Sequence, residues 1–214
     1  MILSAKELSA YLGTVHNNAS ILDKLKIVYR PYICPFDDLI RACQGSETIL
    51  DIGCGSGQFI LLLSKYTNVK KLGGIEVSSS LISNAKQLLT SQTKTEFQIE
   101  IYDGVNIPSF ISEFDTVTVI DVFHHIKKDK QKAFILELYN KMKPGSKLIF
   151  KDIDGSHPLL FMSKIHDILL AGELVKMVSI SEAKEMLGRA GFSIVSISKR
   201  FMLWYPHYTI ICDK

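Results

Sequence analysis

Four acidic side chains end, or directly follow, four successive apolar runs of this sequence: Asp51, Glu76, Asp103 and Asp121. Each run has the length of a strand, and the fourth, 114–122, is rich in β-branched residues, which predicts a strand buried in a parallel sheet. Because the carboxyl ends of parallel strands lie at one edge of a sheet, we expect the four carboxylates to gather there. A single acid at such a position is more often a solvated loop residue. The set as a whole indicates an edge that accepts hydrogen bonds from a ligand.

Three alternate glycines, Gly53, Gly55 and Gly57, separate the first of these runs from a strongly apolar, helix-like segment. The pattern predicts a strand, a tight turn and a helix. Glycine allows positive φ angles and lets a ligand approach the backbone closely, and the first amide groups of the helix point into the same space. The spacing differs from the G-x-G-x-x-G of dinucleotide sites, so a nicotinamide oxidoreductase is the weaker interpretation.

Histidines lie at the same predicted edge. His124 and His125 follow the fourth apolar run, and Asp152 and His157 follow the fifth. An imidazole takes up a proton near neutral pH, so our hypothesis is that one of these three histidines acts as a general base. The simpler alternative for each is a packed or helix-initiating residue.

The bulk properties narrow the class of protein. The 214 residues suit one domain, and the Lys and Arg residues behind the net charge of +3 are scattered, which argues against nucleic acid as a partner. The four cysteines lack metal-ligand spacing, so we expect reduced thiols and no metal. Lys6 and Glu7 interrupt any leader-like start and no run is long enough to span a membrane. We therefore expect a cytoplasmic protein.

The predicted elements alternate along the chain. The expected strands are 48–51, 71–77, 95–102, 114–122 and 147–153, followed by an antiparallel hairpin of 192–201 and 208–212 connected around residues 205–207. The expected helices are 21–30 and 35–43, separated by a break at Arg30-Pro31, then 58–66, one after Ser78, one capped by Asp129, and one with a capping box at Ser179 and Glu182 that ends at Gly191. This order predicts a doubly wound α/β fold with a mostly parallel seven-stranded sheet and an antiparallel C-terminal strand. We expect a single domain, 1–214, with a helical cap at 1–46 and a helical lid at 155–178.

Together these features resemble the class I S-adenosylmethionine-dependent methyltransferases. The resemblance covers the chain from about Glu47 to its end. It rests on five motifs in order along the sequence, ILDIGCGSGQF, GIEVSSSLI, YDGVNIP, FDTVTVIDVFHHI and KMKPGSKLIFKDID. The closing hairpin agrees with the reversed seventh strand of that fold.

The resemblance implies a role for each motif residue. Gly53 and Gly55, with the intervening Cys54, would seat the methionine part of S-adenosylmethionine, and Asp51 would support its amino end. Glu76 would bind the ribose hydroxyls, and Val77 would contact the adenine. Asp103 would accept a hydrogen bond from the adenine amine, with Gly104 leaving room for the ring. Asp121, Val122 and Phe123 would line the sulfonium region. The product would be S-adenosylhomocysteine.

The substrate is less constrained. The fourth motif lacks the Pro-Pro-aromatic run of methyltransferases that act on base amines, and the cap and lid are rich in aromatic and apolar residues, which suits a small, partly apolar molecule. We expect methyl transfer to oxygen or nitrogen of a small molecule. The alternatives are an RNA or protein methyltransferase and an inactive, cofactor-binding regulatory protein. The sequence leaves the oligomeric state open.

Overall fold

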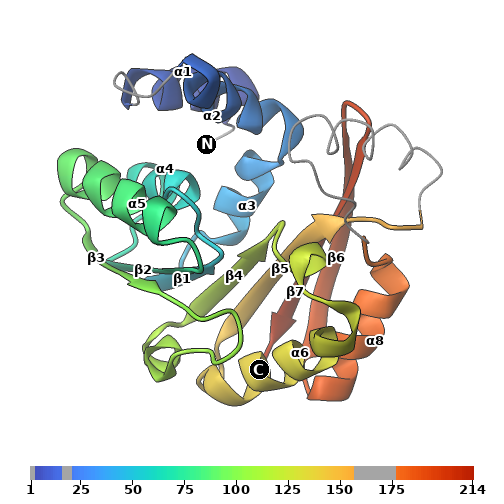
Figure 1. The fold of residues 1–214 in the computed structure, drawn as a ribbon. Coiled ribbons are helices and arrows are strands. Elements are labelled where there is room, and N and C mark those ends of the chain that lie inside the picture. Colours follow the sequence, from blue (N-terminus) through green and yellow to red (C-terminus); the bar gives the residue numbers. More distant parts are fainter. Residues whose placement is uncertain (1–2, 16–20, 157–176) are drawn as a thin grey trace. The chain divides into compact units, whose positions relative to one another are not determined.

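The computed structural model describes residues 3–15, 21–156 and 177–214 (Figure 1). The chain divides into two compact units, residues 1–104 and 105–214. Residues 157–176 of the predicted lid, including His157, lie outside the described residues, so the lid stays a prediction. No helix in the described ranges has the length and apolarity that a membrane span requires.

The strands form a seven-stranded mixed sheet in the order β3-β2-β1-β4-β5-β7-β6. Strands β1, β2 and β3 pair in parallel, as do β4 and β5. Strand β7 runs antiparallel to both β5 and β6. This confirms the predicted fold class, including the reversed C-terminal strand.

The first unit carries three N-terminal helices and the first half of the sheet. Its elements are α1 (Ala5–Val15), α2 (Ile21–Ile33), α3 (Phe36–Ala42), β1 (Thr48–Ile52), α4 (Gln58–Tyr66), β2 (Lys71–Glu76), α5 (Ser79–Gln92) and β3 (Glu96–Ile101). Four of the five β1 residues and all but the end residues of β2 are buried, as expected for strands covered on both faces. Ser78 caps α5, as predicted, by accepting a hydrogen bond from the Leu81 amide.

Two expectations for the N-terminal helices were wrong. Helix α2 continues through Pro31 to Ile33 instead of ending at Arg30. Proline removes only one hydrogen bond there, in the last turn. Pro31 itself is buried, and the Cys34 amide still bonds to the Arg30 carbonyl at 2.9 Å. Helix α1 was not expected. Its sequence signal is Ser4-x-x-Glu7, a capping box in which the Ser4 hydroxyl accepts from the Glu7 amide and Glu7 accepts from the Ser4 amide.

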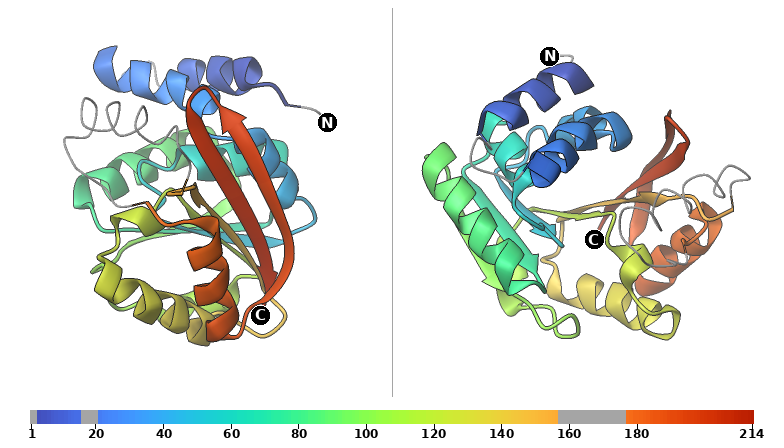
Figure 2. Two further views of the ribbon diagram at one scale, coloured as in Figure 1. Left: turned by 90° about the vertical axis from the view of Figure 1, so that its right-hand side faces the viewer. Right: turned by 45° about the horizontal axis from the view of Figure 1, so that its top comes forward.

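The second unit carries the other half of the sheet. Its elements are η1 (Ser109–Glu113), β4 (Thr116–Ile120), η2 (Phe123–His125), α6 (Lys128–Lys141), β5 (Lys147–Ile153), α8 (Ile180–Ala190), β6 (Ser193–Met202) and β7 (Tyr205–Asp213). Every residue of β4 is buried. Helices α6 and α8 lie side by side, and β6 and β7 form a long hairpin (Figure 2).

Some of the helix ends and turns predicted for this unit are confirmed, and others differ in the structure. The capping box of Ser179 and Glu182 is present, and Gly191 ends α8 with a φ of 112°. Asp129 is not the cap of α6; Lys127 takes that place and Asp129 lies in the first turn, where its charge favours the helix N-terminus. The hairpin turn is also shorter than expected. Residues 205–207 belong to β7, and the turn is made by Leu203, with a φ of 55°, and Trp204.

Candidate functional site

In the first unit, the glycine turn between β1 and α4 takes the backbone conformation that its sequence predicts. Gly53, Gly55 and Gly57 have φ angles of 74°, 54° and 80°. The Gly53 amide bonds to the Ile75 carbonyl at 2.8 Å, which ties the turn to β2. A Cβ on Gly57 would lie 3.1 Å from the Ala85 Cβ, whereas one on Gly55 would meet nothing within 4 Å. Gly57 therefore serves packing against α5, and Gly55 borders open space.

Glu76 lies against this turn from the tip of β2. One carboxylate oxygen accepts a hydrogen bond from the Gly55 amide at 3.1 Å, and the other accepts from the amides of Val77 and Ser78 at 2.7 and 3.0 Å. Three backbone donors thus fix the carboxylate at the edge of the sheet. Each oxygen of an ionised carboxylate has further lone pairs, so the group can still accept from a ligand.

The other predicted binding residues of this unit differ in exposure. Asp51 and Cys54 are buried. Burial, together with the charges of Asp51 and Glu76, raises the pKa of the Cys54 thiol, so the thiol stays protonated and unreactive. Asp103 is exposed, and 58% of the Val77 surface is exposed to solvent. Gly104 has a φ of 79°, and a Cβ on it would lie 3.5 Å from Val77.

In the second unit, Asp121 follows β4 and pairs with a buried lysine. Lys151 of β5 has no exposed surface, and its ammonium group contacts an Asp121 carboxylate oxygen at 2.5 Å. Asp121 also has a φ of 56°, which is uncommon outside glycine although Asp tolerates it better than most residues. The ion pair therefore holds a strained backbone position at the end of β4.

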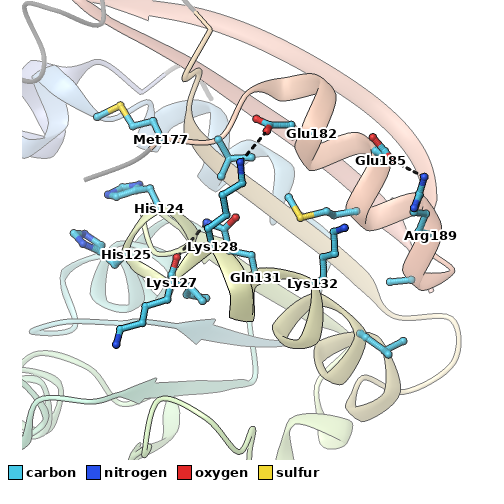
Figure 3. A pocket seen from close by; sticks show the side chains of 15 residues that line it. His124, His125, Lys127, Lys128, Gln131, Lys132, Met177, Glu182, Glu185 and Arg189 are labelled. Atoms are coloured by element: carbon cyan, nitrogen blue, oxygen red, sulfur yellow. Dashed lines mark hydrogen bonds and ion pairs between the residues drawn. The ribbon is translucent and has the colours of Figure 1, made fainter. Parts of the chain in front are cut away.

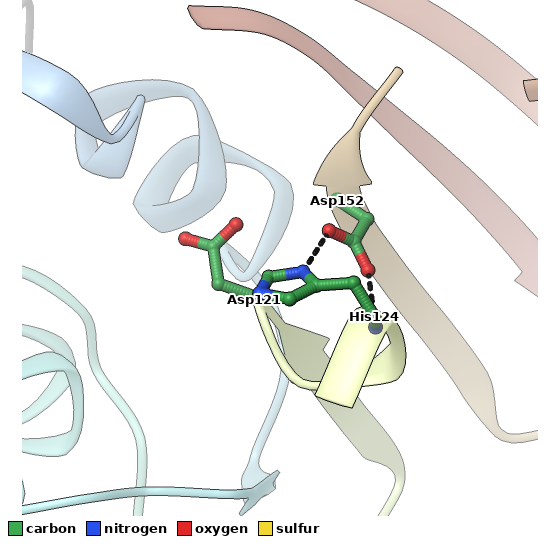
Figure 4. A group of neighbouring side chains, drawn as sticks. All are labelled: Asp121, His124 and Asp152. Atoms are coloured by element: carbon green, nitrogen blue, oxygen red, sulfur yellow. Dashed lines mark hydrogen bonds and ion pairs between the residues drawn. The ribbon is translucent and has the colours of Figure 1, made fainter. Parts of the chain in front are cut away.

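His124 forms a second charged pair with Asp152 at the end of β5 (Figure 4). The His124 Nδ1 and an Asp152 carboxylate oxygen are 2.5 Å apart, and the His124 amide donates to the other oxygen at 3.1 Å. The Ile153 amide donates to Asp152 at 2.8 Å. Because a carboxylate accepts, the His124 Nδ1 carries the proton and Nε2 remains the basic nitrogen.

The environment of His124 makes it a stronger base than a free imidazole. Burial and the nearby charge of Lys151 lower the pKa of the ring. The charge and hydrogen bond of Asp152, together with the charge of Asp121, raise it by more. The pKa of His124 is therefore above its usual 6.5. The ring lies between Asp121 and Asp152 (Figure 4). Asp152 thus holds the ring in one orientation and one tautomer.

The remaining predicted residues of this unit, His125, Val122 and Phe123, differ in exposure. His125 is exposed, and its ring centroid is 4.2 Å from that of His124. Val122 is half-buried. The Phe123 ring is enclosed in the core, where it packs on Phe150 with centroids 5.1 Å apart.

The sequence interpretation noted Asp152 without assigning it a role and missed Lys151. A lysine in the middle of the apolar run LIFKDI was a signal, because a buried lysine needs a partner. Tyr208, which is paired with Asp152 across β5 and β7, was also missed. Burial and the nearby carboxylates raise the pKa of Tyr208.

Asp121, His124 and Asp152 each offer a ligating atom, and these atoms lie within 4.8 Å of one another. Such a set is compatible with a divalent cation. Lys151 already supplies a positive charge to Asp121, and His124 already bonds to Asp152. We therefore interpret the cluster as a paired hydrogen-bond network.

A cavity of about 570 Å³ opens between α6 and α8, with His124 and His125 at one end (Figure 3). Its other lining residues come from the segment that leads into α6, from α6 itself, from Met177 and Val178, and from α8. The volume lies in the range of small-molecule sites.

The geometry of the first unit fits a nucleoside cofactor with an amino-acid tail. The open side of Gly55 leaves space beside the backbone, the fixed Glu76 carboxylate suits a ribose diol, and the exposed Val77 adjoins Gly104. Parallel α/β sheets bind such ligands at the carboxyl ends of their strands.

Comparison with known proteins gives the class to which this arrangement belongs. A family model described as a methyltransferase domain matches residues 28–197. The chain therefore belongs to the methyltransferase-domain family. Its fold is that of solved S-adenosylmethionine-dependent methyltransferases, such as one from Methanosarcina mazei with a TM-score of 0.65 at 20% identity, over 78% of this chain and 92% of that one.

Individual relatives are more distant. The chain is 26% identical over 164 residues to the mitochondrial ubiquinone biosynthesis O-methyltransferase of Schizosaccharomyces pombe, a match that covers 76% of this chain and 54% of that protein. It is 30% identical over 122 residues to the tRNA N(3)-methylcytidine methyltransferase of the same organism, covering 54% of this chain and 39% of that protein. This chain thus spans about half the length of these relatives or less.

Among solved structures, the fold is similar to that of magnesium protoporphyrin IX methyltransferase from Synechocystis PCC 6803, crystallised with S-adenosylhomocysteine. The TM-score is 0.70 at 17% identity, and the match covers 94% of this chain and 91% of the other.

Proposed function

We propose that this methyltransferase transfers its methyl group to an oxygen or nitrogen atom of a small molecule, with His124 as the general base. The observation that carries the proposal is the pairing of His124 with the buried Asp152. A hydroxyl or protonated amine must lose a proton to become a good nucleophile, and an oriented imidazole is suited to take it.

In the proposed reaction, the residues of the second unit have different roles. S-adenosylmethionine supplies an activated methyl group on a sulfonium. Asp152 holds the Nδ1 proton of His124, so Nε2 accepts the proton of the acceptor group. Lys151 fixes Asp121, to which we assign the sulfonium region. Positioning contributes up to about 7–11 kcal/mol to reactions of this kind.

For the first unit, we propose that the glycine turn seats the methionine part, with Asp51 at its amino end. Glu76 accepts hydrogen bonds from the ribose, and Val77, Asp103 and Gly104 surround the adenine. The open side of Gly55 and the fixed carboxylate of Glu76 support these roles.

A tRNA acceptor is the alternative. One relative is a tRNA methyltransferase, and four lysines fall between residues 127 and 132 at the start of α6. A cluster of cations is typical of a surface that contacts phosphates. Of these four lysines, only Lys128 forms an ion pair with a described residue: its ammonium group lies 3.9 Å from a Glu182 carboxylate oxygen.

The test is formation of S-adenosylhomocysteine with a panel of phenols, hydroxy acids and amines, and in parallel with total tRNA. We expect turnover with at least one small acceptor, and loss of that turnover in Asp152→Asn while S-adenosylhomocysteine still binds. Turnover with tRNA and with none of the small acceptors would overturn the proposal.

A further inference from the structure

The cavity between α6 and α8 (Figure 3) has an apolar interior that is suited to a hydrocarbon or aromatic body. Six of its lining residues are apolar and come from both helices and the segments before them: Ile126, Leu136, Met177, Val178, Met186 and Ala190. Leu136 is half exposed. A concavity of this size with several apolar lining residues is typical of a binding site for a small molecule.

The charges around the cavity do not cancel. Lys128 faces Glu182 at 3.9 Å, and Arg189 bonds to Glu185 at 2.7 Å. Lys132 has no ion pair with any described residue, and its side chain points into the space between the two helices (Figure 3). Lys127 points away from that space. Among the described lining residues, the exposed Lys132 is thus a positive charge without an ion pair, beside the apolar residues of the cavity.

The proposed base lies at one end of the same cavity. The His124 ring lines it, and the ring is held there by Asp152. Lys132 comes from the second turn of α6, farther along the cavity. A molecule that reaches both groups has its nucleophilic atom at the histidine and an anionic group at the lysine.

We propose that this cavity is the acceptor site, and that the acceptor is an amphipathic anion: an apolar body with a carboxylate or similar group at one end and the methylated hydroxyl or amine at the other. This rests on the proposed function, because it takes His124 as the base. The apolar walls bind the body, and Lys132 selects for the anion.

Binding of octanoate and 1-octanol, which share a chain length and differ in charge, tests the proposal. Each is titrated against the protein saturated with S-adenosylhomocysteine, with 8-anilinonaphthalene-1-sulfonate as the displaced fluorescent probe. We expect octanoate to displace the probe at about three- to tenfold lower concentration than octanol, the range of a charge-assisted contact at a partly exposed site.

Three variants make the test specific. Lys132→Met should remove most of the preference for octanoate, whereas Lys130→Met, on an exposed part of α6 outside the cavity, should keep it. Met186→Trp should weaken the binding of both compounds, because the larger side chain fills the cavity. Equal displacement by the two compounds in the wild type, or equal effects of the two lysine variants, would overturn the proposal.

The binding readout separates this inference from the proposed function. His124→Gln should leave the preference for octanoate in place. If octanoate binds as expected but no small acceptor is methylated, the proposed function fails and the anion site stands. If small acceptors are methylated while octanoate shows no preference, the anion site fails alone.

Discussion

The two halves of the sheet present their functional groups in different ways. In the first unit, the turn from Gly53 to Gly57 presents backbone groups, and three backbone amides hold the carboxylate of Glu76. In the second, charged side chains from β5 reach residues that follow β4, over separations of 28 and 30 residues. The first arrangement is encoded locally, and the second depends on two strands pairing in the correct register.

The difference predicts that the two halves can be damaged separately. Changes at the glycine turn should affect cofactor binding, and changes at His124, Asp152 or Lys151 should affect catalysis or stability.

The largest effect is expected for His124→Gln. Loss of a general base typically lowers kcat by about 10²–10⁴-fold, and S-adenosylhomocysteine should bind as in the wild type because His124 belongs to the acceptor side. Steady-state kinetics with the best acceptor from the panel, together with calorimetric titration, measure the two quantities. His125→Gln is the matched control, because its ring is exposed, and it should keep most of its activity. Equal losses in both variants would remove His124 from its role.

Lys151→Met should be the most destabilising single change. It leaves Asp121 half-buried without its cation, and breaking a buried ion pair costs about 3–5 kcal/mol. Urea unfolding would show this loss, and the double variant with Asp121→Asn should recover part of it. Lys199→Met, on the exposed strand β6, should change the free energy of unfolding very little. A stable Lys151→Met protein would contradict the interpretation of the pair.

Gly55→Ala tests whether the glycine turn of the first unit binds the cofactor, and Gly45→Ala is its matched control. Gly45 and Gly55 both have positive φ and open space at the Cβ position, so alanine should cost each protein about 1–2 kcal/mol of stability through strain. At Gly55 alone, the methyl group enters the space we assign to the cofactor, and affinity for S-adenosylhomocysteine should fall by about tenfold or more. Equal affinities in the two variants would place the cofactor elsewhere.

The pH dependence follows from the raised pKa of His124. Turnover requires the neutral ring, so kcat should rise with pH through a value above 6.5 and then level off. The free energy of unfolding changes with pH in the opposite direction. The raised pKa stabilises the fold fully below 6.5, and this contribution is lost as pH rises through the folded-state pKa. Both dependences should disappear in His124→Gln. A kcat that stays constant across this range would contradict the role of the base.

Much of the fold could be predicted because its signals are local. Helix α4 and strand β5 have the bounds that the sequence indicated, and the caps at Ser78 and Ser179 depend on residues three positions apart. The errors came where tertiary packing outweighed a local rule, as in α2, which continues past Pro31.

The site could be predicted only in part for the same reason. The acids and glycines of the first unit are visible as spacing in the sequence. The partnership of Asp121 with Lys151 requires the register that pairs Ile120 with Lys151, and no short stretch of sequence contains that information. The sequence leaves His124 as one of three candidate bases, because its contact with Asp152 joins residues 28 positions apart.

The most direct test of the separation between the halves is calorimetric titration of S-adenosylhomocysteine into the Glu76→Gln and His124→Gln proteins. Glu76→Gln removes the carboxylate that we assign to the ribose, so its affinity should fall by about tenfold, the scale of a charged hydrogen bond. His124→Gln should bind as the wild type does. Unchanged affinity in Glu76→Gln, with loss in His124→Gln, would contradict the account.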